Sequence, residues 1–287
     1  MARVQLKVRP RLIGLDLDGT VVDYQNEIPT ATREALQACH AAGIKLAFLT
    51  GRRPRTAGMH LDKLSLPAFA ATNSGCLLWE YPTWHLLTRR LFLAELVAPI
   101  AALLSPHSAN FYVDSQKYDF EFFYLKREHS PVLDIYLKRW GFIAREITDI
   151  QEMEGYEITQ VAMPCPDEEV RRLRDVVRAQ YDSRVLALAV RWPLVDAMAL
   201  ELFHPDANKG SALAYFAQQL GLTAGQCLAV GDDVNDLAMI DWAGYGVAMP
   251  QAGPEVKAVA DEVLDGDGPA ALPAFLERIL ALHAADN

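Results

Sequence analysis

A short apolar run that ends in two closely spaced aspartates constrains this chain more than any other feature. Leu12 to Leu17 has the composition of a buried strand, and Asp16 and Asp18 stand where that strand gives way to Gly19. Side chains two residues apart in a strand share a face, so the two carboxylates are expected to lie close together. One carboxylate can attack phosphorus while the second moves protons, and the pattern therefore indicates phosphoryl transfer.

Strand and helix patterns alternate on both sides of this run. A helix is predicted over 30–42 and an apolar strand over 44–49, which together with the first strand indicates a βαβ unit and a parallel sheet. The same alternation returns after Asp196, where strands are predicted over 197–203 and 226–230. The sequence therefore predicts an α/β core built from both ends of the chain.

The middle of the chain has a different pattern. Apolar and polar residues alternate over 118–124, as in a strand of an antiparallel sheet with one solvated face, and helical stripes lie on either side. This mixture predicts an α+β domain over 83–196, inserted into a discontinuous core domain of 1–82 and 197–287.

Composition excludes several classes of protein. A chain of 287 residues with 51% hydrophobic residues can bury a large core, and a net charge of −10 disfavours binding to nucleic acid or to anionic membranes. The apolar segments are too short to span a bilayer, and the N-terminus lacks the pattern of a secretion signal. Four scattered cysteines predict neither a zinc site nor a disulfide framework, so we expect a cytoplasmic protein.

Three further segments carry groups that suit phosphate chemistry. Thr50 and Gly51 follow the strand over 44–49, where a hydroxyl and an amide can donate to phosphate oxygens. Lys209 precedes a predicted helix, whose N-terminus attracts anions. The acidic run from Asp232 to Asp236 follows another apolar strand and would be repulsive without a hard cation, for which Mg²⁺ is the expected ion.

The Asp-Leu-Asp-Gly-Thr run and these three segments, in this order, resemble the haloacid dehalogenase-like (HAD) phosphohydrolases. Within this superfamily the chain resembles the Cof-type branch, whose cap domain, of class C2B, is inserted between the threonine segment and the lysine segment. The run from Gly244 to Met249 also resembles the GxGVAM segment of that branch. The resemblance implies a Rossmann-like core with a parallel sheet and an inserted α+β cap. It also implies a magnesium-dependent phosphatase for small phosphomonoesters, usually sugar phosphates, that forms an aspartyl-phosphate intermediate.

The resemblance also implies a role for individual residues. Asp16 would be the nucleophile and a magnesium ligand, Asp18 the general acid/base with its backbone carbonyl on the metal, and Asp232 the second carboxylate ligand. The transferring phosphoryl group would be held by four residues, Thr50, Gly51, Lys209 and Asn235. The ligands would be oriented from behind by two carboxylates, Asp233 and Asp236.

Two segments leave more than one interpretation open. The stretch Pro250 to Pro254 departs from the small or asparagine-containing stretch that usually follows GVAM, and it can alter a loop near the site. Thr72 to Gly75 resembles the branch's turn leading to the cap and either approaches the substrate or is a plain tight turn. The cap should select the substrate, but its polar residues receive no role here: Asp114, Arg127, His129 and Arg191.

Rival functions differ in their products. A phosphomutase of the phosphomannomutase type would release an isomer rather than phosphate, and a catalytically inactive protein would only bind a phosphorylated metabolite. Asp16, Asp18, Lys209 and Asp232 are all present, which disfavours the inactive form. A dinucleotide-binding dehydrogenase is disfavoured because no GxGxxG follows the first strand. The expected partner is a small phosphorylated metabolite, and the chain is expected to be a monomer or a homodimer.

Overall fold

The computed structural model describes residues 9–105, 107–115, 117–125, 131–192 and 196–284. The chain forms two compact units, one from Met1–Arg89 with Asn208–Asn287 and the other from Arg90–Ala207. The smaller unit is continuous in sequence and lies between the two segments that form the larger unit.

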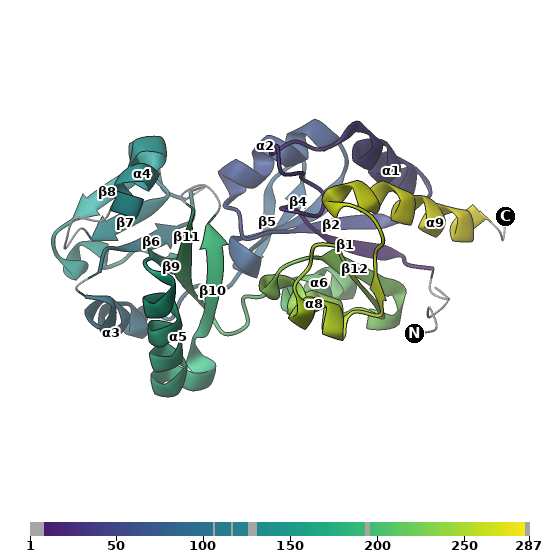
Figure 1. Ribbon diagram of the computed structural model, residues 1–287. Coiled ribbons are helices and arrows are strands. Elements are labelled where there is room, and N and C mark those ends of the chain that lie inside the picture. Colours follow the sequence, from purple (N-terminus) through teal and green to yellow (C-terminus); the bar gives the residue numbers. More distant parts are fainter. Residues whose placement is uncertain (1–8, 106, 116, 126–130, 193–195, 285–287) are drawn as a thin grey trace. The chain divides into compact units, whose positions relative to one another are not determined.

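An eight-stranded sheet lies at the centre of the larger unit (Figure 1). Its strand order is β14-β13-β12-β1-β2-β3-β4-β5, with parallel pairing from β14 to β3 and antiparallel pairing for β4 and β5. The strands are β1 (Leu12–Asp16), β2 (Lys45–Leu49), β3 (Ala68–Thr72), β4 (Leu77–Tyr81), β5 (His85–Arg89), β12 (Cys227–Gly231), β13 (Tyr245–Ala248) and β14 (Glu262–Val263).

Helices cover both faces of this sheet, with α1, α2 and α9 on one side and α6 and α8 on the other (Figure 1). They are α1 (Thr30–Ala41), α2 (Pro54–Leu64), α6 (Lys209–Gln219), α7 (Leu237–Trp242), α8 (Pro254–Val259) and α9 (Leu272–Ala284). Because both faces are covered, a central strand must be apolar throughout, and all five residues of β1 are buried. Polar groups of this sheet are therefore confined to strand ends, and ligands bind at the carboxyl ends in such folds.

The smaller unit has a six-stranded sheet with the order β10-β11-β9-β6-β7-β8. All neighbours are antiparallel except β7 and β8, which are joined through a helix. The strands are β6 (Ala109–Val113), β7 (Phe122–Leu125), β8 (Ala144–Ile147), β9 (Ile158–Pro164), β10 (Leu186–Trp192) and β11 (Ala197–Phe203).

Three helices pack on this second sheet: α3 (Ala94–Leu104), α4 (Pro131–Trp140) and α5 (Asp167–Tyr181). Apolar residues of α3 and α5, such as Ile100 and Leu173, form one core with Phe111 and Val161 of the sheet. Tyr136 of α4 belongs to a separate aromatic cluster with Tyr112 and Phe122, so the opposite sheet face is partly covered by α4.

The sequence prediction assigns two strands to the wrong unit. The expected insert of 83–196 includes the strand now labelled β5, but β5 pairs with β4 in the larger sheet. The expected core includes 197–203, but β11 pairs antiparallel with β10 along its full length in the smaller sheet. A connection of a few residues allows only a hairpin, because parallel strands need a long crossover. The insert accordingly runs from Arg90 to Ala207.

The strand predicted over 118–124 is also shorter than expected. Only Phe122–Leu125 forms β7, and Phe120 belongs to the core under α3 and α5 while Phe122 belongs to the cluster under α4. The aromatic residues of this segment therefore pack into two separate hydrophobic clusters and do not line a single face of the sheet. Arg127 and His129 lie outside the described residues.

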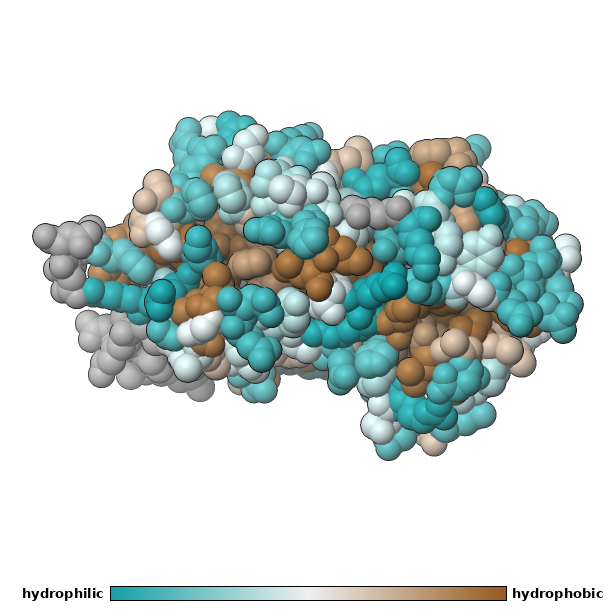
Figure 2. Space-filling model, turned by 180° about the vertical axis from the view of Figure 1, so that it is seen from behind, coloured by the Kyte–Doolittle hydropathy of each residue, from teal (hydrophilic) through white to brown (hydrophobic). Residues whose placement is uncertain are grey.

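Hydrophilic residues dominate the face drawn in Figure 2, with hydrophobic residues in patches between them. All four cysteines are buried and free of disulfide bonds. Among the described residues, no helix is long and apolar enough to cross a membrane.

Candidate active site

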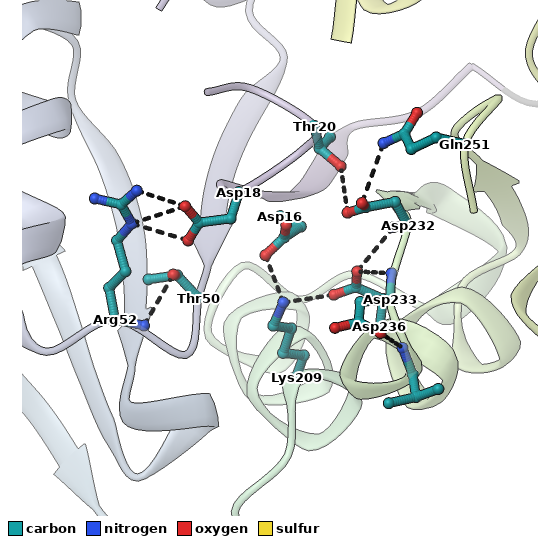
Figure 3. A network of polar contacts seen from close by, with 11 residues as sticks. Asp16, Asp18, Thr20, Thr50, Arg52, Lys209, Asp232, Asp233, Asp236 and Gln251 are labelled. Atoms are coloured by element: carbon teal, nitrogen blue, oxygen red, sulfur yellow. Dashed lines mark hydrogen bonds and ion pairs between the residues drawn. The ribbon is translucent and has the colours of Figure 1, made fainter. Parts of the chain in front are cut away.

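Four loops meet at the carboxyl edge of the larger sheet (Figure 3). β1 lies between β2 and β12, so the end of β1 at Asp16 neighbours Thr50 after β2 and Asp232 after β12. Lys209 begins α6, which packs against β2 and β3. The fold thus brings all four predicted segments to one edge of the sheet.

The start of α6 fixes the position of Lys209. Asn208 is the N-cap, and its side-chain oxygen accepts a hydrogen bond of 2.8 Å from the backbone N–H of Ser211. The next residue is Lys209, only 1% exposed, whose Nζ lies 2.5 Å from Asp16 Oδ1 and 2.5 Å from Asp236 Oδ1. One buried ammonium therefore bridges the predicted nucleophile and the last residue of the acidic run.

Asp236 also shapes the loop that follows β12. Its second oxygen accepts hydrogen bonds from the backbone N–H groups of Asp232 at 2.9 Å and Asp233 at 3.0 Å. Asp233 is exposed and caps the next turn through the N–H of Val234. Asp236 is thus in direct contact with Lys209, whereas Asp233 caps the turn from Val234 to Asp236 in a reciprocal capping box.

Two side chains hold Asp232 from the side opposite Lys209. Thr20 Oγ1 donates to Asp232 Oδ1 at 3.4 Å, and Gln251 Nε2 donates to Oδ2 at 3.1 Å. Gln251 also donates to the carbonyl oxygen of Gly19 at 2.6 Å. Gly19 has φ of +79°, a conformation that suits glycine and lets the chain turn at the end of the Asp-x-Asp run.

The electrostatics of this cluster are dominated by carboxylates. One oxygen from each of Asp16, Asp232 and Asp236 lies within 4.8 Å of the others. Burial, together with Asp236 and Asp232, raises the pKa of Asp16 well above its usual range against the pull of Lys209, and burial with Asp236 raises the pKa of Asp232 to about 7.

The pKa of Lys209 is raised, although burial acts to lower it. Burial alone lowers the pKa of Lys209, but Asp16 and Asp236 more than offset this, so the pKa lies above its usual value. Three carboxylates around one ammonium leave an excess of negative charge, and an all-oxygen donor set of this kind fits a hard divalent cation. The residues present are therefore suited to such an ion.

The side chain of Asp18 lies outside this cluster. It is 54% exposed and turns to Arg52, whose Nε donates to Asp18 Oδ2 at 2.8 Å and whose Nη2 also binds the carboxylate (Figure 3). Of the three predicted metal residues, the structure thus groups the carboxylates of Asp16 and Asp232. The metal contact expected of Asp18 is through its backbone carbonyl.

Thr50, Gly51 and Asn235 lie next to one another. Thr50 is buried and its Oγ1 accepts from the N–H of Arg52 at 3.0 Å, which leaves its own proton to donate. A methyl group added at Gly51 would lie 3.5 Å from Ser74 Oγ and 3.9 Å from Asn235 Nδ2. Asn235 Oδ1 and Ser74 Oγ are buried without hydrogen-bond partners in the described part of the chain, as expected of groups that await a ligand.

Sequence reasoning assigns no role to Arg52 or Gln251, yet both contact predicted site residues. Arg52 directly follows the Thr-Gly pair, which is already predicted to lie at the sheet edge. The charge of a residue at this position is the signal that could identify it. Gln251 lies in the stretch noted for its departure from the GVAM context. Its contact with Asp232 depends on packing between distant loops, which no local pattern predicts.

Comparison with known proteins gives a consistent result. The profile of the haloacid dehalogenase-like hydrolase family matches residues 13–268. The HMP-PP phosphatase of Cronobacter sakazakii is 28% identical over 86% of this chain and 87% of that protein. The 5-amino-6-(5-phospho-D-ribitylamino)uracil phosphatase YcsE of Bacillus subtilis is 27% identical over 89% of this chain and 90% of its own length.

Solved structures show the same fold. The HAD subclass IIB sugar phosphatase BT4131 aligns with a TM-score of 0.73 at 20% identity, over 93% of this chain and 98% of that one. The shared architecture thus includes the insert as well as the larger sheet.

Proposed function

Since this chain belongs to the haloacid dehalogenase-like hydrolase family and is a phosphatase of small phosphorylated substrates, we propose that it acts through an aspartyl-phosphate on Asp16 with Mg²⁺ as cofactor. The observation that carries the proposal is the buried contact of Lys209 with both Asp16 and Asp236, next to Asp232. A buried charge cluster of this composition is costly for a fold and matches the needs of phosphoryl transfer.

In the first half of the proposed reaction, an oxygen of Asp16 attacks phosphorus and the bond from phosphorus to the leaving oxygen breaks. Asp18 gives its proton to that oxygen, so an alcohol leaves. Lys209 holds Asp16 in place and offsets negative charge on the phosphoryl group, while Thr50, the Gly51 amide and Asn235 donate to its oxygens.

In the second half, Asp18 takes a proton from water, which attacks the phosphoryl group and frees Asp16. Asp16, Asp232 and the backbone carbonyl of Asp18 would hold the Mg²⁺ ion, with Asp236 and Asp233 shaping the loop behind them. When bound, the ion supplies positive charge opposite the phosphoryl oxygens.

For the substrate we propose a small phosphomonoester, with sugar phosphates as the first class to test. The solved sugar phosphatase with the same fold supports this class. The two similar phosphatases of Cronobacter sakazakii and Bacillus subtilis support a second panel, HMP-PP and the phosphorylated ribitylaminouracil.

The test is magnesium-dependent phosphate release from an aryl phosphate and both panels, with wild type and Asp16→Asn side by side. We expect release that stops on chelation of the metal and falls by at least ~10³-fold in the variant, because no nucleophile remains. Circular dichroism should show an intact fold. An isomeric product without free phosphate would indicate a mutase, and an Asp16→Asn variant of near wild-type activity would contradict the proposal.

A further inference from the structure

Arg52 contacts the predicted general acid/base, Asp18, through two of its nitrogens. It follows Thr50 and Gly51 at the end of β2, and its side chain turns back toward the loop after β1 (Figure 3). Its Nε lies 2.8 Å from Asp18 Oδ2 and 3.1 Å from Oδ1, and Nη2 also contacts Oδ1. A guanidinium that meets a carboxylate through two nitrogens fixes both the position and the plane of that carboxylate.

The remaining donors of Arg52 bind the protein as well. Nη2 donates to Asn26 Oδ1 at 2.8 Å, and Nη1 lies 2.5 Å from His60 Nε2. A guanidinium has five N–H groups, so contacts with described residues occupy about four of them. Arg52 is therefore committed to protein contacts and is poorly placed to bind a substrate phosphate.

His60 supports Arg52 from the buried side. It lies in α2, is 2% exposed, and its Nε2 must accept the hydrogen bond because a guanidinium can only donate. Burial and the charge of Arg52 lower the pKa of His60, so the ring is neutral at pH 7 with its proton on Nδ1. A neutral ring is the form that can hold the guanidinium from behind.

Asn26 supports Arg52 from the exposed side. It has φ of +62° in a turn where Asp23 Oδ1 accepts from the N–H groups of Gln25 and Glu27. Glu27 is in turn bound to Lys63 of α2 at 2.5 Å. The turn after the Asp-x-Asp run is thus tied to the same helix that carries His60.

We propose that Arg52 is the positioning residue for Asp18, held by His60 and Asn26, in the reaction proposed above. Asp18 is half-exposed and follows the buried strand, so without Arg52 its side chain would sample several rotamers. Proton transfer requires the carboxyl group within hydrogen-bond reach of the leaving oxygen, and loss of that geometry lowers the rate. The inference rests on the proposed function.

The test uses leaving groups that differ in their need for a proton. Nitrophenolate leaves without protonation, whereas the alkoxide of a sugar or alkyl phosphate does not. We expect Arg52→Ala to lower kcat/KM for an alkyl phosphate by about 10²-fold, within the range for acid–base catalysis, and for p-nitrophenyl phosphate by less than about tenfold. Arg52→Lys should lie between wild type and Arg52→Ala, because an ammonium restores charge without the planar fork.

A double variant decides whether Arg52 acts through Asp18. Asp18→Asn and Asp18→Asn/Arg52→Ala should have the same kcat/KM, since a positioning residue has no effect once its partner is gone. His60→Phe should reproduce part of the leaving-group effect, and Arg55→Ala, which removes an exposed charge nearby, should not.

The outcomes separate this inference from the proposed function. Equal losses for both leaving groups, additive losses in the double variant, or a raised KM with unchanged kcat would each overturn the positioning role. Wild type without Asp16-dependent phosphate release would instead overturn the proposed function, and the role of Arg52 with it.

Discussion

The two units place their buried polar side chains in different parts of their sheets. In the larger unit the buried polar side chains of the site lie at a strand end, in loops or at a helix start, as Asp16, Thr50, Asp236 and Lys209 do. In the smaller unit several buried polar side chains lie within strands, as Asn110, Gln160 and Glu201 do. The register sets Asn110 beside Ala162 and Ala162 beside Glu201, so two polar residues lie on one line across three strands with an alanine between them.

The difference follows from how each sheet is covered. A parallel sheet with helices on both faces tolerates polar groups only at its ends, where short local patterns encode them. The antiparallel sheet has one face covered by α3 and α5 and the other covered in part, which allows polar side chains along its strands. Asn110 and Glu201 are about 90 positions apart in the sequence, and only the folded chain brings their strands to either side of β9.

The largest effect that would sharpen this contrast is expected at Lys209. Lys209→Met leaves Asp16 and Asp236 buried without their shared cation, which should lower the free energy of unfolding by about 3–5 kcal/mol. Urea denaturation in chelator at pH 7.5 measures it. Lys63→Met breaks an exposed pair and serves as the control, with an expected loss below about 1 kcal/mol. Similar losses in both variants would mean that burial adds nothing to the contacts of Lys209.

The next effect is a pH dependence of stability in metal-free protein. The folded pKa of Asp232 is about 7, above its unfolded value, so the folded state holds a proton that the unfolded state releases. Stability from this residue is therefore present below pH 4 and lost as the pH rises to about 7. Melting temperatures in chelator should fall over this window, and Asp232→Asn should flatten the slope. A wild-type slope unchanged by that substitution would assign the effect elsewhere.

A smaller effect of opposite sign is expected in the smaller unit. Both polar atoms of the Asn110 side chain are buried without hydrogen-bond partners in the described part of the chain. Asn110→Leu keeps the branched shape and should stabilise the protein by about 1 kcal/mol, or about 2–4 °C in melting temperature. Asn110→Asp should do the reverse. A destabilised Asn110→Leu would mean that the amide makes a contact that the structure does not show.

The smallest effect is expected at the surface of the smaller unit. Hydrogen bonds from Arg172 and His107 lower the pKa of Glu169 to about 2, so its contribution to stability is present above pH 4.5 and lost as the pH falls toward 2. Glu169→Gln should cost less than about 1 kcal/mol at pH 7, measured by urea denaturation. The difference from wild type should vanish near pH 2, and a constant difference would point to packing instead.

The sequence predicts those elements of the fold and site that are determined by residues close together in the chain. Strand β1, the start of α6 and the acidic loop after β12 each depend on neighbouring residues, so their grouping at one sheet edge could be predicted. The residues that were missed act across loops: Arg52 on Asp18, and Gln251 on Asp232. The assignment of β11 failed because strand content is local but strand partners are not.

One junction between the insert and the larger unit lies directly beside a residue of the site. The chain leaves the larger unit after β5 at Arg89 and re-enters at Asn208, the cap residue that immediately fixes Lys209. The position of Lys209 is fixed by residues of the larger unit, through the cap at Asn208 and the contacts with Asp16 and Asp236. We therefore expect an exchange of the insert at these two junctions to leave the lysine in place.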